Sequence, residues 1–438
     1  LIRESDERPD LLRIGRDEKL NEEIREEYSI NDVKEKWYQN VRRTCDNYSK
    51  NALEEIGISE EEFNEYFLKL ENSKVENTDF SEKDRTFIEK FEEKTKGVKS
   101  EKIRKILEIQ REWTEQLKKC EEVELYIIKS TVIIAGTCTG FVSNRIIRDV
   151  EFDYVIVDEA AKATFPELAV SLNRAHKIIL VGDHQQLPPV LDTEIIKNNK
   201  EKLNEESLSQ GIFERMYNMF PEENKHRLTI QYRMHPTIGT LISHVFYNDE
   251  IQNGVEAKDR DLAIEGYEGI AVEWISTSKY LDKDRFEKEF DNNGKKSYQN
   301  YLERNIIERK LLELDSKLDK KTKAAVITGY GAQKYILQTM VKQHSFKNLE
   351  IDVDTVDAFQ GSQKDIILYS TVRSSGNKYG IGFLKSEARI NVAFSRAKCL
   401  LIIVGDMKFL DNYRIRGNKF PQIIKYISEF EGCRIIEK

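Results

Sequence analysis

The sequence predicts an α/β fold in which two domains are each built on a parallel β-sheet. From Glu124 onward, short apolar runs alternate with helical patterns, and continuous apolar runs are typical of strands that helices cover on both faces. A chain of 438 residues has room for about two to three domains of roughly 150 residues each. The runs are too many and too far apart for one sheet, so we expect a division near residues 220–230. They lie at 131–136, 154–157, 177–181, 324–328, 352–356, 365–371 and 399–404.

The stretch 254–300 has a different composition from its surroundings. It is rich in Gly, Asp, Asn and Lys, and the first three of these favour turns. Only residues 270–275 within it have the apolar pattern of a strand. We therefore expect loops around a single strand in this part of the chain.

Residues 31–122 predict long, charged helices, because they contain no Pro and few Gly. Near the end of this segment, apolar residues recur at heptad spacing, which predicts a seam between helices. The simplest structure for such a segment is a solvated antiparallel helical hairpin. The seam residues are Ile103, Ile106, Trp113, Leu117 and Cys120, with Gln110 as the exception.

The composition excludes several classes of protein. Apolar residues make up 39% of the chain, and no apolar stretch reaches the roughly 18 residues of a membrane span. The five cysteines are far apart and form no C-x-x-C pair, which argues against zinc or iron–sulfur ligation and favours a reducing, intracellular setting. The net charge of −8 argues against general polyanion coating but leaves room for a local basic groove.

Two adjacent acids follow one of the predicted strands, in "FDYVIVDEAA". Ligands bind at the carboxyl ends of parallel strands, where Asp158 and Glu159 stand. One carboxylate can hold a magnesium ion, usually through water, and the second can orient or deprotonate an attacking water. The alternative is a helix start that uses two acids near the positive end of the dipole. Taken alone, this stretch does not decide between the two.

The next strand also ends in polar residues, in "KIILVGDHQQLPP". A Gln at this place, such as Gln186, can sense a γ-phosphate or the water beside it. A histidine such as His184 is by itself more often structural than catalytic. Two neighbouring strands that end in polar residues at one edge favour a ligand site over two coincidences.

Two arginines and a Gly-broken turn complete the candidate set. Arg233 lies in "LTIQYRMHP", and Arg396 precedes a strand in "NVAFSRAKCLLIIVGD". A lone Arg is usually a surface charge, but two from a second domain that face a nucleotide would act as arginine fingers on the developing phosphoryl charge. The turn within residues 354–374 has polar residues that could touch both nucleotide and nucleic acid.

In their order along the chain, these stretches resemble the motifs of the superfamily 1B helicases, in the branch that contains the nonsense-mediated-decay RNA helicase and senataxin. The resemblance covers about residues 124–438 and is specific, because five motifs stand in the family's order with similar spacing. They are "DEAA" (motif II), "GDHQQLPP" (motif III), "QYRMHP" (motif IV), "VDAFQGSQKD" (motif V) and "NVAFSRAK" (motif VI). "GTCTG" also resembles motif Ic, "SYQNYLERNIIE" the family's Asn-x-x-Glu helix, and "LLRIGR" the stretch after motif Ia.

The resemblance implies P-loop NTPase architecture, with two RecA-like domains of which the first is incomplete here. On this alignment residues 1–30 are a remnant of the first domain and 31–122 are a coiled-coil-like helical insertion. Residues 123–224 are the rest of the first domain with motifs II and III, and 225–438 are the second domain with motifs IV to VI.

The resemblance also implies roles for individual residues. Asp158 would hold Mg²⁺, Glu159 would activate water, Gln186 would contact the γ-phosphate, and Arg233 and Arg396 would be the fingers. The residues expected to bind the nucleotide cofactor are Tyr232, beside the base or ribose, and Gly361, Gln363 and Gln333. The residues expected to meet nucleic acid are Thr137, Thr139, Pro188 and Asp357.

Some positions depart from the family pattern. Gln363 stands where motif V usually has Glu, which keeps hydrogen bonding but removes a charge from the ribose or γ-phosphate contact. Gly329 in "TGYGAQ" stands where Pro is common, and "FSRAK" replaces a commoner Leu-Thr pair.

The phosphate-binding loop G-x-x-x-x-G-K-[ST] does not occur in the sequence. The nearest candidate, Gly294–Lys295, is followed by Lys296, and Glu289 stands in place of the first Gly. The chain opens "LIRESDERPD", without an initiator Met or a signal-peptide pattern. The family carries this loop before motif Ia, so we expect a fragment that begins after it and is inactive alone.

The expected function is that of an ATP-dependent helicase or translocase with ATP and Mg²⁺ as cofactors. The resemblance implies 5′-to-3′ movement on single-stranded DNA or RNA, and the sequence does not distinguish the two. We expect a monomeric motor without a membrane segment, intracellular and cytoplasmic, or nuclear in a eukaryote. Two alternatives are an ATPase-dead nucleic-acid-binding or scaffold protein, and a split helicase whose P-loop is on another chain.

Overall fold

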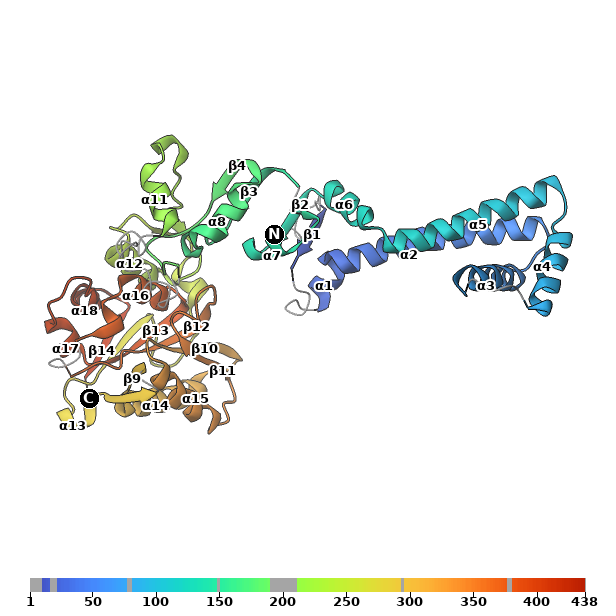
Figure 1. Cartoon of the computed structure of the whole chain (residues 1–438). Helices are drawn as coiled ribbons and strands as arrows, with labels where there is room; N and C mark the ends of the chain where they lie inside the picture. Colours follow the sequence, from blue (N-terminus) through green and yellow to red (C-terminus); the bar gives the residue numbers. More distant parts are fainter. Residues whose placement is uncertain are drawn as a thin grey trace. The chain divides into compact units, whose positions relative to one another are not determined.

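The computed structural model describes residues 10–15, 22–76, 81–147, 150–189, 211–292, 295–375 and 380–437. It divides into two compact units, which are described separately (Figure 1). Unit 1 consists of Leu1–Ile156 and Pro166–Ile179, and unit 2 consists of Val157–Phe165 and Leu180–Lys438. The predicted domain bounds at residues 31, 123 and 225 stay a prediction.

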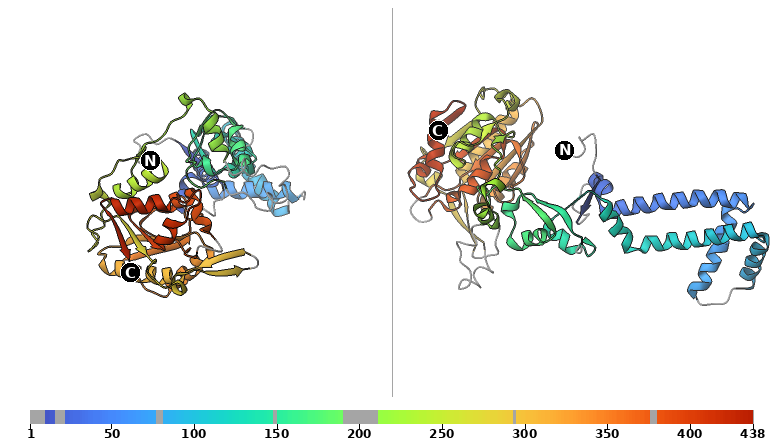
Figure 2. Two further views of the ribbon diagram at one scale, coloured as in Figure 1. Left: turned by 90° about the vertical axis from the view of Figure 1, so that its left-hand side faces the viewer. Right: turned by 90° about the horizontal axis from the view of Figure 1, so that it is seen from above.

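The predicted helices are present in unit 1, and two of them form a long antiparallel pair (Figure 2). Lys99 at the start of α5 pairs with Glu55 at the end of α2, and Lys118 at the end of α5 lies 5.6 Å from the ring centre of Tyr38 near the start of α2. The helices are α1 (Glu22–Tyr28), α2 (Ile30–Glu55), α3 (Glu60–Glu76), α4 (Glu82–Lys94), α5 (Val98–Lys119), α6 (Glu121–Ser130), α7 (Cys138–Ser143) and α8 (Phe165–Leu172).

The predicted heptad seam on α5 is only partly correct. Ile103, Leu117 and Cys120 pack against buried clusters, as expected. Ile106 and Trp113, however, are 39% and 51% exposed. The buried positions between them are Leu107 and Thr114, so in the middle of α5 the inward face lies one residue further along the chain than predicted.

Unit 1 contains two small sheets. Strands β1 (Leu11–Ile14) and β2 (Ile133–Gly136) are parallel, and Leu12 and Ile14 are buried there. In the second sheet β3 (Phe152–Val157) pairs with β4 (Ala175–Leu180). Hydrogen bonds from Phe152 N–H to the carbonyl of Arg174 and from Val181 N–H to the carbonyl of Val157 show that the two strands are parallel. The predicted strands are therefore present. The predicted cover on both faces is not, since Tyr154 and Ile156 are 54% and 66% exposed.

Unit 2 is built on a six-stranded sheet with the order β11-β10-β12-β13-β7-β14, in which every described pairing is parallel. Successive residues of a strand point to opposite faces, so Ala325 and Ile327 join one hydrophobic cluster and Ala324 and Val326 the other. The strands are β7 (Val272–Ser276), β10 (Thr322–Thr328), β11 (Leu349–Thr355), β12 (Lys364–Ser370), β13 (Ala397–Gly405) and β14 (Cys433–Glu437). This arrangement confirms the predicted α/β class.

Helices cover both faces of this sheet. Residues of α12, α16, α17 and α18 belong to one cluster, and residues of α14 and α15 belong to the other. The helices are α11 (Ile212–Met219), α12 (Pro236–Phe246), α13 (Asp282–Arg285), α14 (Tyr301–Lys317), α15 (Gly331–Lys342), α16 (Glu387–Phe394), α17 (Met407–Asn412) and α18 (Phe420–Glu429).

The stretch 254–300 contains more structure than predicted. Beside β7 it forms an antiparallel hairpin of β8 (Lys288–Asn292) and β9 (Lys295–Gln299). The prediction of a single strand was wrong because most side chains of this hairpin are charged or amides, so its sequence lacks the apolar–polar alternation by which strands are recognised. A further short parallel pair joins β5 (Ile230–Gln231) to β6 (Gln252–Asn253).

None of the helices in the described ranges combines the length and the apolar character that crossing a bilayer requires.

Candidate active site

The two acids lie on a strained turn directly after β3. Asp158 Oδ1 accepts the main-chain N–H of Glu159 at 2.9 Å, and Glu159 has a left-handed φ of 53°. Such a conformation is uncommon outside glycine and is concentrated at functional sites. Glu159 precedes a short 3₁₀ helix, η4 (Ala160–Lys162), but its side chain makes no capping hydrogen bond. The helix-cap alternative therefore loses support, and both acids are exposed.

The loop after β4 lies against this turn. Ala160 N–H donates to the carbonyl of Val181 at 2.8 Å. A Cβ at Gly182 would lie 2.8 Å from Ala161 N, so the close approach of the two loops requires glycine. The acids and the polar loop 182–187 therefore share one edge, as the sequence predicts.

Asp183 organises the polar loop. Its Oδ1 accepts the N–H of Gln185 at 2.9 Å, and its Oδ2 accepts the Gln186 amide at 2.8 Å. The same Oδ2 accepts the hydroxyl of Tyr247, just beyond α12, at 2.5 Å. Three donors therefore hold this carboxylate.

The predicted arginine fingers meet this loop. Arg396 is 3% exposed and donates to Gln186 Oε1 at 2.8 Å and to the carbonyl of Val392 at 3.1 Å. Arg233 donates to the carbonyl of Ser395 at 3.3 Å. Side chains that are predicted to be catalytic and are far apart in sequence thus lie together within unit 2.

The charges of these groups act on one another. Burial and, to a smaller extent, the neighbouring charge of Arg233 lower the pKa of Arg396 to about 10, and Glu159 opposes the change. Burial also lowers the pKa of Arg233, again opposed by Glu159. Arginine keeps its charge in proteins at neutral pH, and the charge of Glu159 acts on both the buried Arg396 and the half-buried Arg233.

A pocket of about 390 Å³ lies beside Arg233. It collects residues from motif IV (Tyr232 and Arg233), from motif V (Gln363) and from the loop before β10 (Lys320 and Lys321). Three aspartates also line it, but cations outnumber them, and an excess of cations beside an aromatic ring and an amide suits a phosphorylated ligand.

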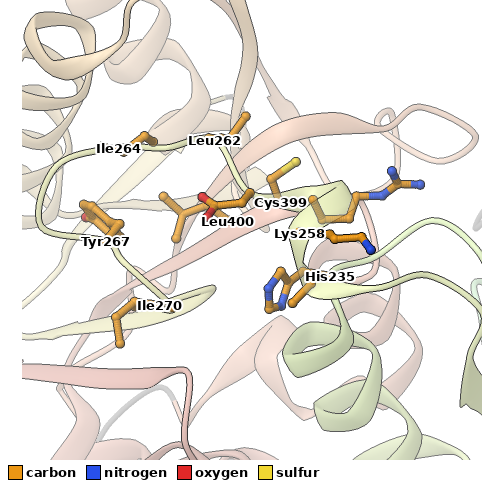
Figure 3. A pocket seen from close by; sticks show the side chains of 12 residues that line it. His235, Lys258, Leu262, Ile264, Tyr267, Ile270, Cys399 and Leu400 are labelled. Carbon is orange, nitrogen blue, oxygen red and sulfur yellow. The ribbon is translucent and has the colours of Figure 1, made fainter.

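An adjoining pocket of about 240 Å³ shares Arg260, Asp261, Leu262 and Cys399 with the first. Figure 3 shows this second pocket from close by. Its lining is more apolar and includes Leu262, Ile264 and Ile270. We assign no ligand to it.

Two family models, both described as AAA domain, match residues 1–194 and 208–408. The chain is 34% identical over 304 residues to a regulator of nonsense transcripts 1 homologue of Neurospora crassa, which covers 67% of this chain and 26% of that protein. It is 31% identical over 358 residues to an uncharacterised ATP-dependent helicase of Methanocaldococcus jannaschii, which covers 78% of this chain and 48% of that protein.

The chain belongs to the Upf1-like branch of the superfamily 1 helicases. It spans about a quarter of the length of the Neurospora relative and about half of the archaeal one. Among solved structures, a PRRSV helicase matches with 16% identity and a TM-score of 0.31, over 63% of this chain and 38% of that chain.

The other predicted helicase residues lie in different places. Tyr232 is 63% exposed at the pocket that Gln363 also lines. Gly361 has a φ of +82° in the turn before β12, a conformation that favours glycine. Pro188 is exposed beside Gln186.

Three residues predicted to meet nucleic acid are also accessible. Thr137 and Thr139 are exposed at the start of α7 in unit 1, with their hydroxyl oxygens 3.4 Å apart. Asp357 is exposed but forms an ion pair with Arg389 at 3.2 Å. Nucleic acid would therefore compete with Arg389 for any contact to Asp357.

Gln333, which was predicted to bind the cofactor, lies in the interior of unit 2, and its role stays a prediction. Gln333 is 0% exposed, and its amide oxygen accepts the N–H of Asn300 at 2.7 Å. Its amide nitrogen donates to the carbonyl of Asn300 and to Ser370 Oγ. Both ends of the side-chain amide are therefore hydrogen-bonded within unit 2.

Sequence reasoning missed residues that hold the site together. Arg260 donates to the main-chain carbonyls of Arg233 at 2.8 Å and Tyr232 at 2.7 Å. Asn391 donates to the Tyr247 hydroxyl at 2.8 Å and to the carbonyl of Gln185 at 3.0 Å. No local pattern marks these residues, because each acts on a segment far away in the sequence.

Proposed function

We propose that this chain forms the water-activating and charge-stabilising part of an ATP-hydrolysing helicase motor. The observation that carries the proposal is the convergence of Glu159, Gln186, the buried Arg396 and the half-buried Arg233 in unit 2. The names of the relatives, among them ATP-dependent helicases, support the same activity.

The proposed roles follow from the geometry. Glu159 is exposed on its strained turn and can accept a proton from a water molecule that attacks the γ-phosphate. Gln186 can orient that water or the phosphate through its amide. Arg233 and Arg396 stabilise the negative charge that develops on the transferred phosphoryl group, and their burial strengthens this effect.

The site suits magnesium as the nucleotide's metal ion. Within the described ranges no three His, Cys, Asp or Glu side chains gather into a metal-binding cluster. Mg²⁺ at nucleotide sites needs only one or two carboxylates, together with phosphates and water, and the exposed Asp158 supplies one. The ion would neutralise charge on the β- and γ-phosphates.

The remaining parts of the proposal concern the substrate and the cell. We infer a motor on single-stranded DNA or RNA, with Thr137 and Thr139 among the contacts to its backbone and movement from 5′ to 3′. We infer that the motor is monomeric and intracellular. We also infer that the helices between residues 31 and 122 are an insertion in the first of two RecA-like domains.

Replacing Glu159 with Gln tests the hydrolytic role. In the full-length gene product, Glu159→Gln should keep ATP binding and lower nucleic-acid-stimulated ATP turnover by about a hundredfold or more, because the amide cannot take up the proton. Turnover is measured by phosphate release, and binding by titration with a fluorescent ATP analogue. Glu151→Gln, an exposed acid just before β3, is the matched control and should behave as wild type. Unchanged turnover in Glu159→Gln would remove this residue from the mechanism.

A further inference from the structure

Tyr247 connects the polar loop of the candidate active site to the helix that ends beside Arg396. Its hydroxyl donates to Asp183 Oδ2 at 2.5 Å and accepts the amide N–H of Asn391 on α16 at 2.8 Å. The Tyr247 ring packs against a buried core cluster. Burial, with Asp183 close by, raises the pKa of Tyr247 far above its usual value, so the hydroxyl keeps its proton.

These bonds have a fixed direction. An ionised carboxylate only accepts hydrogen bonds, so both Tyr247 and the Gln186 amide must donate to Asp183. Once the amide nitrogen of Gln186 points to Asp183, its oxygen points the other way and accepts from Arg396 at 2.8 Å. The orientation of Gln186 therefore depends on the position of the Asp183 carboxylate.

We propose that Tyr247 is a positioning residue for ATP hydrolysis, which sets the amide orientation of Gln186 by holding Asp183. This inference rests on the proposed function, because Gln186 acts there on the phosphate or the water. Without the hydroxyl, Asp183 loses one of its three donors and is free to move. A flipped Gln186 would then present N–H groups to Arg396, and two donors repel each other.

The arrangement closes into a ring. Asn391 lies on α16 and also donates to the main-chain carbonyl of Gln185 at 3.0 Å, and Arg396, two residues beyond the end of α16, donates back to the carbonyl of Val392 on that helix. The chain of bonds therefore leaves α16 at Asn391, passes through Tyr247, Asp183 and Gln186, and returns at Arg396. Such connected bonds support one another, so loss of one member should disturb the others.

Tyr247→Phe tests the proposal, because it removes only the hydroxyl. In the full-length gene product we expect kcat for ATP to fall roughly ten- to a hundredfold, with KM changed less than about threefold, since a misplaced group impairs the chemical step more than binding. Tyr426→Phe is the matched control: Tyr426 is 3% exposed on α18, and its loss of a hydroxyl should leave kcat unchanged. Equal melting temperatures would exclude a general loss of stability.

A double-mutant cycle adds a second criterion. Asp183→Asn should also lower kcat, and Tyr247→Phe should have little further effect in that background, because both changes act through the same carboxylate. Additive effects of the two substitutions, or a wild-type kcat in Tyr247→Phe, would overturn the proposal.

A measurement on the chain of residues 1–438 separates this inference from the proposed function. The side-chain amide of Gln186 can be observed by ¹⁵N NMR and assigned through Gln186→Glu. We expect its signals to shift or broaden in Tyr247→Phe and to stay in place in Tyr426→Phe. An undisturbed amide in Tyr247→Phe would refute the positioning role, whereas absent ATPase activity with a disturbed amide would refute only the proposed function.

Discussion

At the scale of single residues, Glu303 is a buried acid that shapes the carboxyl edge of the unit 2 sheet. It is 0% exposed on the first turn of α14 and accepts hydrogen bonds from Ser370 Oγ at 2.6 Å, Thr371 Oγ1 at 3.1 Å and Val372 N at 2.9 Å. Val372 has a φ of 70°, an outlier for a β-branched residue. The Glu303 side chain therefore fixes a strained backbone directly after β12.

Glu303 should make the stability of the protein depend on pH. Burial raises its pKa from 4.5 to about 8, against the opposing effect of its hydrogen-bond donors. Between these values the native acid holds a proton that the unfolded chain releases, so stability falls as pH rises from about 4.5 to 8, by at most about 1.4 kcal/mol per pH unit. Urea unfolding of wild type and Glu303→Gln at pH 5 and pH 8.5 measures this.

The comparison isolates Glu303 from other titrating groups. Gln resembles the protonated acid and has no charge to lose, so the stability of wild type relative to Glu303→Gln should drop between the two pH values. A relative stability that rises with pH would mean that the native carboxyl is ionised.

Single residues also show where sequence reasoning reaches its limit. The positions of Asp158 and Gln186 could be predicted, because Asp158 directly follows β3 and Gln186 lies in the loop after β4, at an edge where ligands bind. Tyr247 could not, since its bond to Asp183 spans 64 residues. Gln333 belongs to a matching motif, but the motif does not reveal that the fold uses both ends of its amide.

At the scale of elements, α5 shows how a correct helix can be assigned the wrong face. The apolar pattern identifies the helix, but Ile106, Ile109 and Trp113 form a stripe that is as regular as the buried one. Only packing against the neighbouring helices distinguishes them: Leu107 is 1% exposed, whereas Ile109 is 66% exposed. The strands of unit 2 were easier to predict, because helices cover both faces of the sheet, so the residues on both faces are apolar and no buried face has to be assigned.

Truncating one residue of each stripe tests this assignment. Leu107→Ala should destabilise the helices of unit 1 by about 2–5 kcal/mol, because it leaves a cavity among Phe63, Tyr66 and their neighbours. Ile109→Ala on the same helix is the control and should change stability by less than about 0.5 kcal/mol. Thermal unfolding followed by circular dichroism at 222 nm measures both. Equal losses in the two variants would contradict the assigned face.

At the scale of the whole molecule, each unit has hydrophobic clusters of its own. The clusters around Leu12 and Leu53 belong to unit 1, and the two clusters on either side of the six-stranded sheet belong to unit 2. Units with separate cores can unfold separately. The sequence predicts a division into domains, but the two-unit division depends on contacts between distant segments.

The three tryptophans allow the units to be followed individually. Trp37 and Trp113 lie in unit 1, and Trp274, which is 0% exposed, lies in unit 2. Trp274→Phe leaves only the tryptophans of unit 1, and the double variant Trp37→Phe/Trp113→Phe leaves only the tryptophan of unit 2. We expect the fluorescence of the two variants to change at different urea concentrations. Coincident transitions in the two variants would show that the chain unfolds as one cooperative unit.

The bond between Gln186 and Arg396 joins residues 210 positions apart. A ribosome that adds about 5–20 residues per second needs roughly 10–40 s to synthesise that interval. During this time the nascent chain exposes its acids and its polar loop without the arginines that complete them. The proposed hydrolysis site can therefore be complete only after Arg396 has been synthesised, long after its acids and its polar loop.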